Sequence, residues 1–367
     1  MTKPIKILYA ASTQSHLERF HSPYIEELKK YGTVSLMATG KDMDFPVLFD
    51  KHFFSFSNLK SIVKIRRILK QNAFDLILVH TTLAAFLIRM ALKGLKKRPY
   101  VINTVHGYLF QEDLKGLKAK ILLLCEKLVR RQTDDIVVMN QEDLRIAEKH
   151  RLCRDAVYLI NGMGIPDVFP RPEENIALRQ QFVTGEKDFL CTFVGELSHR
   201  KNQLFLLQAT QRLKEKNIPI RLCLIGEGNT RELLQDEIRA LGLEDSVFLV
   251  GSSSKVNSFL SITDLYVSAS ISEGLPFNVM EAMAYGLPIL ASDVKGQRDL
   301  LEDHPTALYP LGEMELFCQG VEQIYSTESR GVSSVSYPCL KQYRLSSVFS
   351  SNMEIFLKGL RVNEKAE

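Results

Sequence analysis

Two glutamates eight residues apart, Glu273 and Glu281, lie in the stretch SEGLPFNVMEAMAYGLPILASD at 272–293. The residues between and after them have a helical pattern, with Pro276 at the first helical position and Gly286 at the end. Amides at the start of a helix and the helix dipole together favour a phosphate. Carboxylates only accept hydrogen bonds, so the two glutamates suit donors such as paired sugar hydroxyls. The stretch therefore predicts a phosphate-binding helix start between two sugar-binding groups.

From this spacing alone, an ordinary structural role for both glutamates stays open. Glu273 could cap the helix, and Glu281 could be a helical residue that faces solvent. A second stretch, VGELSHRKNQ, favours the binding interpretation, because Gly195 follows a strand pattern and Arg200 and Lys201 precede a helix. Cations at the carboxyl end of a strand suit a diphosphate, although such a pair more often faces solvent.

Short apolar runs alternate with helical patterns along most of the chain, which is typical of parallel strands buried on both faces. We expect two doubly wound α/β domains, with the ligand at the carboxyl ends of the strands. The expected boundaries are 1–163 for the amino-terminal domain, 164–175 for a linker rich in Gly, Pro and charge, 176–345 for the carboxy-terminal domain, and 346–367 for a terminal helix and tail.

The expected elements follow the same patterns. Strands are expected at 5–11, 33–39, 74–80, 100–106, 135–140 and 156–162, and then at 189–195, 220–226, 247–251, 265–270 and 288–293. Helices are expected at 22–32, where Gly32 is the stop signal, and at 58–72, 82–97, 114–132, 230–242 and 346–360.

Composition excludes several classes of protein. The six cysteines form no C-x-x-C pair, which indicates reduced thiols in a cytosolic protein. The start, MTKPIKILYAAST, has too short an apolar run for a signal peptide. The longest apolar runs, such as ILLLC, fall far short of the ~20 residues that span a bilayer. The sequence therefore predicts no segment that crosses a membrane.

The net charge of +4 is unevenly distributed along the chain. Residues 1–160 hold 27 Lys and Arg against 16 Asp and Glu, a net +11, and the remainder has a net −7. Cations alternate with apolar residues at 64–70, 93–98 and 114–120, as in basic amphipathic helices that bind anionic lipid surfaces. The alternative is ordinary helices that pack on their own sheet. No nucleic-acid-binding motif accompanies the cations, so nucleic acid is not an expected partner.

Motifs in both halves resemble retaining glycosyltransferase family 4, whose fold is GT-B. In the second half they are G-E-L with R-K-N, G-E-G at 226–228, D-L-Y-V, and E-G-L-P with M-E-A-M-A-x-G-L-P. In the first half, LVHTTLAAFLIRMA, NTVHGYLF and VVMNQEDLRIAEK resemble bacterial capsule and exopolysaccharide transferases. The resemblance covers nearly the whole chain. It implies two Rossmann-like domains that face a cleft, with the terminal helix crossing back to the amino-terminal domain.

The resemblance also implies roles for individual residues. Glu281 would bind the ribose of the donor nucleotide, and Glu273 the hydroxyls of the transferred sugar. Lys201, helped by Arg200, would neutralise the departing diphosphate. His106, at the end of an amino-domain strand, would face the donor sugar, with a buried structural histidine as the alternative. The other expected donor-binding residues are Gly274, Leu275, Pro276, Phe277, Gly195 and Gly251.

Two positions depart from the family pattern. Many members have arginine directly after the strand-end glycine, where this chain has Glu196, which leaves more charge compensation to the cations that follow. The family's glycine pair after the first strand is also missing. His16 and His21 stand there and are candidates for shaping the acceptor site, although ordinary loop and cap roles stay open.

The resemblance implies no metal. Asp42 and Asp44 form a D-M-D sequence that mimics the D-x-D of the other major transferase fold, but it stands in a polar loop. Lys201, Arg200 and the helix start can replace a divalent cation electrostatically. We therefore expect no cofactor other than the nucleotide sugar, which is a co-substrate.

The expected function is retaining transfer of a hexose or N-acetylhexosamine from a UDP-sugar to a polyprenyl-diphosphate-linked oligosaccharide. The expected place is the inner face of the cytoplasmic membrane, in capsule or exopolysaccharide synthesis. Two alternatives stay open, a UDP-sugar 2-epimerase of the same fold and a non-catalytic sugar-nucleotide-binding subunit of a polysaccharide complex. The presence of the two glutamates, Lys201 and His106 argues against the second of these.

Overall fold

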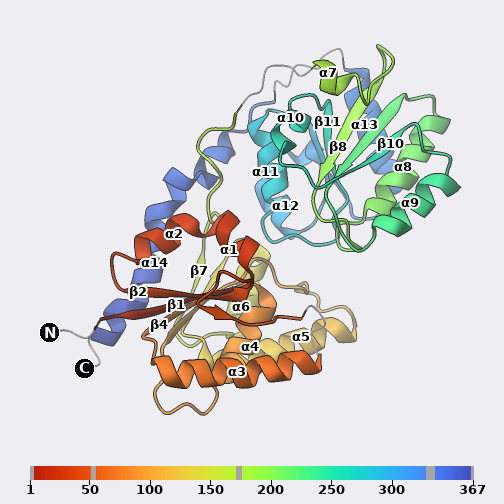
Figure 1. The fold of residues 1–367 in the computed structure, drawn as a ribbon. Helices are drawn as coiled ribbons and strands as arrows, with labels where there is room; N and C mark the ends of the chain where they lie inside the picture. Colours follow the sequence, from red (N-terminus) through yellow and green to blue (C-terminus); the bar gives the residue numbers. More distant parts are fainter. Residues whose placement is uncertain (1–3, 51–54, 171–175, 328–334, 365–367) are drawn as a thin grey trace. The chain divides into compact units, whose positions relative to one another are not determined.

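The structure, a computed structural model, describes residues 4–50, 55–170, 176–327 and 335–364. Part of the expected linker, 171–175, lies outside the described residues. The chain divides into two compact units, residues 1–164 with 345–367 (unit 1) and residues 165–344 (unit 2) (Figure 1). Each unit is a parallel β-sheet with helices packed on it, as expected from the apolar runs.

Unit 1 contains a seven-stranded parallel sheet with the order β3-β2-β1-β4-β5-β6-β7. The strand order therefore reverses between β1 and β4. All residues of β4, β5 and β6 are buried, because helices cover both faces of the sheet. The strands are β1 (Lys6–Thr13), β2 (Thr33–Thr39), β3 (Phe45–Pro46), β4 (Leu76–His80), β5 (Tyr100–Thr104), β6 (Asp135–Val138) and β7 (Ala156–Leu159).

The helices of unit 1 lie in two layers. Figure 1 shows α3, α4 and α5 on one face of the sheet, and α2 and α14 on the other. The helices are α1 (Gln14–Phe20), α2 (Ser22–Leu28), α3 (Phe56–Asn72), α4 (Thr82–Leu92), α5 (Gly116–Val129), α6 (Gln141–His150) and α14 (Leu345–Glu364), with a 3₁₀ turn at Arg130–Gln132.

The terminal helix α14 packs closely on the sheet of unit 1. A Cβ added to Gly359 would lie 2.6 Å from Leu76 Cδ1 and 2.8 Å from Tyr100 Cδ1. The buried Asn352 side chain donates hydrogen bonds to the Tyr24 hydroxyl (3.0 Å) and the Gly162 carbonyl (2.9 Å). The predicted return of this helix to the amino-terminal domain is thereby confirmed.

Two of the predicted helices end four and five residues earlier than expected. The helix that begins at Ser22 ends at Leu28 and not at Gly32, which instead packs against the backbone of Ile5, where a Cβ would collide. Helix α4 ends at Leu92, because Gly94, with φ of 73°, turns the chain. The cations at 93–98 therefore lie on a loop and not on an amphipathic helix.

Unit 2 contains a six-stranded parallel sheet with the order β10-β9-β8-β11-β12-β13, which reverses between β8 and β11. Its core lies between the sheet and α8, α9 and α13. The strands are β8 (Phe189–Val194), β9 (Ile220–Ile225), β10 (Val247–Gly251), β11 (Leu265–Ser268), β12 (Ile289–Ser292) and β13 (Leu308–Tyr309). The helices are α7 (Ile176–Arg179), α8 (Gln203–Glu215), α9 (Arg231–Ala240), α10 (Val256–Leu260), α11 (Phe277–Ala284), α12 (Lys295–Leu300) and α13 (Met314–Ser326), with 3₁₀ turns at Pro305–Ala307 and Pro338–Tyr343.

Candidate active site

Two loops meet where the strand order of unit 2 reverses. The loop after β8 carries Arg200 and Lys201, and the loop after the adjacent β11 carries Glu273. The Ile271 amide donates a hydrogen bond to the Arg200 carbonyl (2.8 Å) and joins the loops. Ligands of doubly wound sheets bind at this position, outside the carboxyl ends of the strands. The fold therefore places the predicted cations and the first glutamate together at a favoured ligand position.

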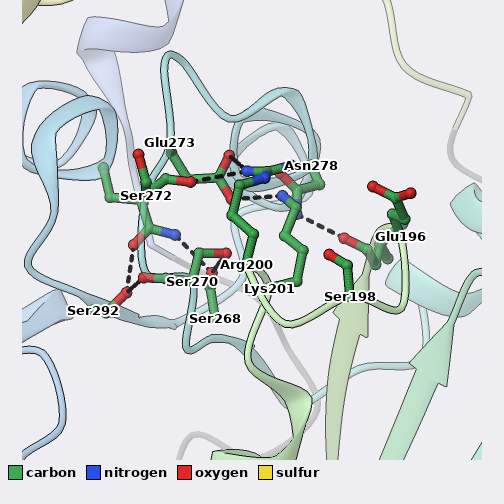
Figure 2. A network of polar contacts seen from close by, with 12 residues as sticks. Glu196, Ser198, Arg200, Lys201, Ser268, Ser270, Ser272, Glu273, Asn278 and Ser292 are labelled. Carbon is green, nitrogen blue, oxygen red and sulfur yellow. Dashed lines mark hydrogen bonds and ion pairs between the residues drawn. The ribbon is translucent and has the colours of Figure 1, made fainter. Parts of the chain in front are cut away.

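The Glu273 carboxylate binds both cations of the neighbouring loop (Figure 2). Lys201 Nζ lies 2.5 Å from Oε1, and Arg200 Nη1 lies 3.1 Å from Oε2. Glu273 and Lys201 are each only 7% exposed, whereas Arg200 reaches solvent. Burial on its own would raise the pKa of Glu273, but the charges of Lys201 and Arg200 bring it below its usual value. The carboxylate is therefore ionised at neutral pH, and the three groups carry one net positive charge.

Helix α11 begins directly after the Glu273 loop. Its first residue is Phe277, and Pro276 is the N-cap residue rather than the first helical residue, because its ψ of 104° is extended. The Pro276 carbonyl accepts the first bonds of the helix, from Val279 and Met280 (both 3.2 Å). The Asn278 side chain donates to the Val194 carbonyl at the end of β8 (2.6 Å), which ties the helix start to the neighbouring strand. The predicted helix start is thus present, one residue later than expected.

The second glutamate, Glu281, lies in the second turn of α11 and is half-buried. Burial raises the pKa of the Tyr266 hydroxyl on β11, and the nearby charge of Glu281 raises it further. The Oε2 atom of Glu281 is buried, so the side chain does not extend into open solvent. Glu273 does not cap the helix either, since Pro276 is the N-cap residue. Gly286 ends the helix as predicted, with φ of 67°.

The other residues predicted on this loop are tightly packed. Gly274, Leu275 and Pro276 are buried, and Phe277 is half-buried. Gly296 of α12 lies against the backbone of Gly274, where a Cβ would collide with the Gly274 carbonyl oxygen. The backbone that leads into α11 is therefore held in one position, which suits precise hydrogen bonding to a ligand.

Glycines end three neighbouring strands of unit 2. Gly195 follows β8, Gly226 follows β9, and Gly251 ends β10. A Cβ on Gly226 would collide with the Gly195 carbonyl, so the β8 loop passes directly over the end of β9. The Gly226 amide donates to the Gly251 carbonyl (2.9 Å). Gly195 thus belongs to the Lys201 loop, whereas Gly251 lies two strands from β8, on the side away from Glu273.

A buried polar network below Glu273 was not predicted from the sequence (Figure 2). Gln297 Nε2 donates to Ser268 Oγ (2.6 Å), and Ser292 Oγ lies within hydrogen-bond distance of Gln297 Oε1 (3.0 Å) and the Ser270 carbonyl (2.6 Å). All four side chains are fully buried. The sequence signal for this network was the presence of serines at the carboxyl ends of the two apolar runs 265–270 and 288–293.

Four histidines gather at the carboxyl ends of the central strands of unit 1. His16 and His21 follow β1, His80 ends β4, and His106 follows β5. In five of the pairs the ring centroids lie 4.1–5.6 Å apart. The fold thus brings together the three histidines that the sequence singled out. His80 was missed, although it too ends an apolar run.

The histidine rings are neutral at pH 7. Burial lowers the pKa of His16 to about 4, and it lowers those of His21, His80 and His106 well below the ordinary value, with repulsion among the rings adding to the effect. The Tyr9 hydroxyl lies 2.9 Å from Nδ1 of His21, and Nε2 of His106 lies 3.4 Å from Nδ1 of His80. The Nε2 atoms of His16, His21 and His80 have no hydrogen-bond partner among the described residues.

The two aspartates of the D-M-D sequence bind different neighbours. Asp44 accepts a hydrogen bond from the Leu36 amide (2.8 Å), and Asp42 accepts one from the Gln14 side chain (3.1 Å). Both residues are exposed. The pair thus contributes to the local structure of the loop after β2.

Comparison with known proteins identifies two family matches that together span most of the chain. Residues 6–140 match the family described as glycosyl transferase 4-like, and residues 174–331 match glycosyl transferases group 1. The protein named "Putative glycosyltransferase EpsD" of Bacillus subtilis (strain 168) is 30% identical over 340 residues, 89% of this chain and 88% of that protein.

More distant relatives agree with these matches. The UDP-Gal:alpha-D-GlcNAc-diphosphoundecaprenol alpha-1,3-galactosyltransferase of Escherichia coli is 23% identical over 77% of this chain and 74% of that protein. Anabaena HepE, solved in complex with UDP and glucose, superposes with a TM-score of 0.72 at 18% identity, covering 96% of this chain and 100% of that chain. Sucrose-phosphate synthase from Thermosynechococcus elongatus superposes with a TM-score of 0.73 at 16% identity, covering 99% of each chain.

The structural likenesses show that the two units form a GT-B fold, as the sequence predicted. The group 1 match spans the glutamates, the cations and the helix start of unit 2, and the EpsD relative covers 89% of the chain. The chain belongs to the glycosyltransferases, with a glycosyl transferase 4-like amino-terminal part and a group 1 carboxy-terminal part.

Proposed function

We propose that this glycosyltransferase moves a hexose or N-acetylhexosamine from a UDP-sugar, with retained anomeric configuration, to a polyprenyl-diphosphate-linked oligosaccharide. The observation that carries the proposal is the binding of Glu273 to Lys201 and Arg200 where β8 and β11 meet, next to the start of α11. A net positive charge and a helix start together suit a diphosphate. The Escherichia coli relative, whose name describes a UDP-Gal donor and a diphosphoundecaprenol acceptor, supports both substrate classes.

In this proposal, different residues of unit 2 bind the diphosphate, the transferred sugar and the ribose of the donor. Lys201 and Arg200 bind the diphosphate and stabilise the charge that develops as it departs. A carboxylate has about four lone-pair sites, so Glu273 can keep a cation and still accept hydrogen bonds from sugar hydroxyls. Glu281, about one and a half turns from the start of α11, accepts hydrogen bonds from the ribose. Gly195 and the backbone from Gly274 to Phe277 line the diphosphate.

In unit 1 we propose that His106 takes part in transfer and that His16 and His21 contribute to the acceptor site. A neutral imidazole donates a hydrogen bond through one ring nitrogen and accepts one through the other. It can therefore bind a sugar hydroxyl that acts as acceptor or as donor. The biological setting we propose is capsule or exopolysaccharide synthesis, which the name of the amylovoran biosynthesis glycosyltransferase AmsD of Erwinia amylovora, 27% identical over 59% of the chain, supports.

The decisive experiment is incubation with a panel of nucleotide sugars, with and without extracts that contain lipid-linked acceptors. UDP release that requires the acceptor supports transfer. A 2-epimerase would instead change the sugar of the nucleotide without any acceptor. A non-catalytic subunit would bind a nucleotide sugar and release nothing, which would contradict the proposal.

A second expectation is that transfer proceeds without a divalent cation, since Lys201, Arg200 and the start of α11 already supply positive potential at the diphosphate. Activity measured in EDTA should equal activity in magnesium. The Lys201→Ala variant should lose transfer under both conditions. If EDTA abolishes transfer and magnesium or manganese restores it, the proposal is wrong and Asp42 and Asp44 return as candidate ligands.

Unit 1 also exposes apolar side chains among its cations. The exposed fractions are 72% for Phe56 and 63% for Val63 on α3, and 73% for Leu117 and 65% for Leu124 on α5. Exposed lysines lie beside them on both helices, namely Lys60, Lys64, Lys118 and Lys120. No described helix is long and apolar enough to cross a bilayer. We propose that α3 and α5 lie on the anionic inner face of the cytoplasmic membrane.

The cations of the 64–70 and 93–98 clusters include two kinds of residue. Arg98 forms two hydrogen bonds with the buried carboxylate of Asp134 (2.7 and 2.5 Å), and Arg66 donates to the carbonyls of Ala91 and Lys93 at the end of α4. These two arginines support the fold. Lys96 and Lys97 are exposed and can face a membrane.

The membrane proposal predicts co-sedimentation with anionic vesicles at low salt and release at high salt. Each cation near an anionic leaflet contributes about 1 kcal/mol, and this attraction is screened as the Debye length falls from ~10 Å at 0.1 M to ~3 Å at 1 M. Lys96→Glu with Lys97→Glu should weaken binding without changing UDP affinity. The control, Lys187→Glu with Lys255→Glu, makes the same change of charge at exposed positions of unit 2. Equal, negligible binding to neutral and anionic vesicles would contradict the proposal.

A further inference from the structure

We propose that His16, His21 and His106 form a zinc-binding site at the carboxyl ends of β1 and β5. Each of the three side chains offers one ring nitrogen, and the three nitrogens lie within 4.8 Å of one another. In a tetrahedral zinc site with Zn–N bonds of about 2.0–2.1 Å, two nitrogens lie about 3.3 Å apart. Small side-chain rotations therefore bring the three imidazoles to bonding distance.

The atoms around His21 orient it as a metal ligand. Its Nδ1 lies 2.9 Å from the Tyr9 hydroxyl, while its buried Nε2 has no hydrogen-bond partner among the described residues. When the Nδ1–H donates to the Tyr9 oxygen, Nε2 carries the free lone pair that a metal needs. Metal-bound histidines almost always have their second nitrogen held in this way. Tyr9, which is fully buried, is therefore a positioning residue for the site.

His80 contacts His106, the third ligand of the proposed site. Its Nδ1 lies 3.4 Å from Nε2 of His106, and its ring stacks on Tyr9 with a centroid distance of 4.7 Å. His80 itself is fully buried and is not among the three ligands. The Nε2 atom of His106 therefore contacts His80, which holds the His106 ring in place beside His16 and His21.

The type of ligand atom determines which metals this cluster can bind. Imidazole nitrogen suits zinc, copper, nickel and iron, whereas magnesium, calcium and manganese prefer carboxylate, carbonyl and water oxygens. Within the described residues, no carboxylate belongs to this group of ligands. Three protein ligands leave a fourth position for water or a substrate oxygen, as in zinc sites that remain open. His16 and His106 are half-buried, whereas His21 is fully buried.

The test uses the full-length chain, freed of metal and carrying no added polyhistidine. Titration with Co²⁺, which takes the same tetrahedral geometry and absorbs visible light, should show one ion bound per chain, and Zn²⁺ should displace it. His21→Gln should abolish the absorption band. Tyr9→Phe removes only the hydroxyl and should weaken zinc binding about ten- to a hundredfold while retaining the tetrahedral band. Circular dichroism checks that each variant is folded.

The matched control is His150→Gln with His199→Gln, two histidines outside the cluster. It should bind Co²⁺ like the parent. The proposal is overturned if the parent shows no tetrahedral band, or if the control loses binding while His21→Gln and Tyr9→Phe keep it. Because binding is measured without any sugar, this outcome is separate from the test of transfer. If His106 also acts in transfer, which rests on the proposed function, zinc should inhibit the reaction and EDTA should restore it.

Discussion

Replacing Glu273 by glutamine is expected to lower the rate of sugar transfer about a hundred- to a thousandfold, the usual effect of removing one preorganised charged or polar group from a reacting centre. UDP affinity should be nearly unchanged, because the proposed contacts of Glu273 are to the sugar and not to the nucleotide. The measurement is transfer with a competent donor, beside calorimetric titration with UDP. Unchanged turnover would remove Glu273 from the proposed mechanism.

A structural explanation of the same result must be separated from a catalytic one. Glu273→Gln leaves the buried ammonium of Lys201 without its nearest counter-charge, and breaking a buried ion pair costs about 3–5 kcal/mol. The double variant Glu273→Gln with Lys201→Met removes both charges and should unfold near the temperature of the parent. It should still be inactive. Near-parental transfer by the double variant would show that the pair only supports the fold.

The pH dependence of stability follows from the same ion pairs. The pKa of Glu273 is lowered in the folded chain from an ordinary value of 4.5, so its stabilising effect is fully present above pH 4.5. The effect is lost as the pH falls through the lowered pKa and the carboxylate becomes protonated. The difference in free energy of unfolding between the parent and Glu273→Gln should therefore be largest at neutral pH and shrink in acid. Thermal unfolding across this range measures it.

Replacing Glu281 by alanine is expected to weaken binding of both UDP and the UDP-sugar, because the ribose is the part that they share. Loss of one or two hydrogen bonds to a charged group costs about 1.5–3 kcal/mol each, which is roughly ten- to a hundredfold in affinity. The two ligands should lose affinity by the same factor in calorimetric titrations. This pattern is opposite to the one expected for Glu273.

The control for Glu281 is Glu302→Ala, which removes an exposed glutamate from the same unit. It should bind UDP like the parent. Glu281→Gln keeps the size of the side chain and should fall between the parent and the alanine variant. An unchanged UDP affinity in Glu281→Ala would exclude this residue from the ribose site.

Much of the fold follows from local patterns in the sequence. Apolar runs of four to eight residues with helical patterns between them are enough to predict parallel strands, since each run reports burial on both faces. Nine of the eleven expected strands differ from the observed bounds at one or both ends, by up to three residues, while their existence and their order along the chain are as expected. The two-residue strands β3 and β13 were missed, because they are too short to show a pattern.

The candidate site was also partly accessible from the sequence. Arg200 and Lys201 were identified because residues that follow an apolar run come to the carboxyl edge of a parallel sheet. Glu273 was identified from its spacing to Glu281 around a predicted helix start. Their chemical type, and a resemblance to known transferases, then suggested roles. The sequence predicted two separate groups, cations for the diphosphate and a carboxylate for a sugar. In the structure they form one hydrogen-bonded cluster.

Only the tertiary structure decided which side chains meet. Lys201 and Glu273 are 72 positions apart and bond because β8 and β11 are neighbours in a sheet whose order no local pattern encodes. The histidine cluster likewise draws on the ends of β1, β4 and β5, and His80 could not be assigned to it from its own surroundings. Periodicity records which face of an element is buried. Strand order, which sets the partners across that face, is a property of the whole chain, because it depends on the packing of all the elements together.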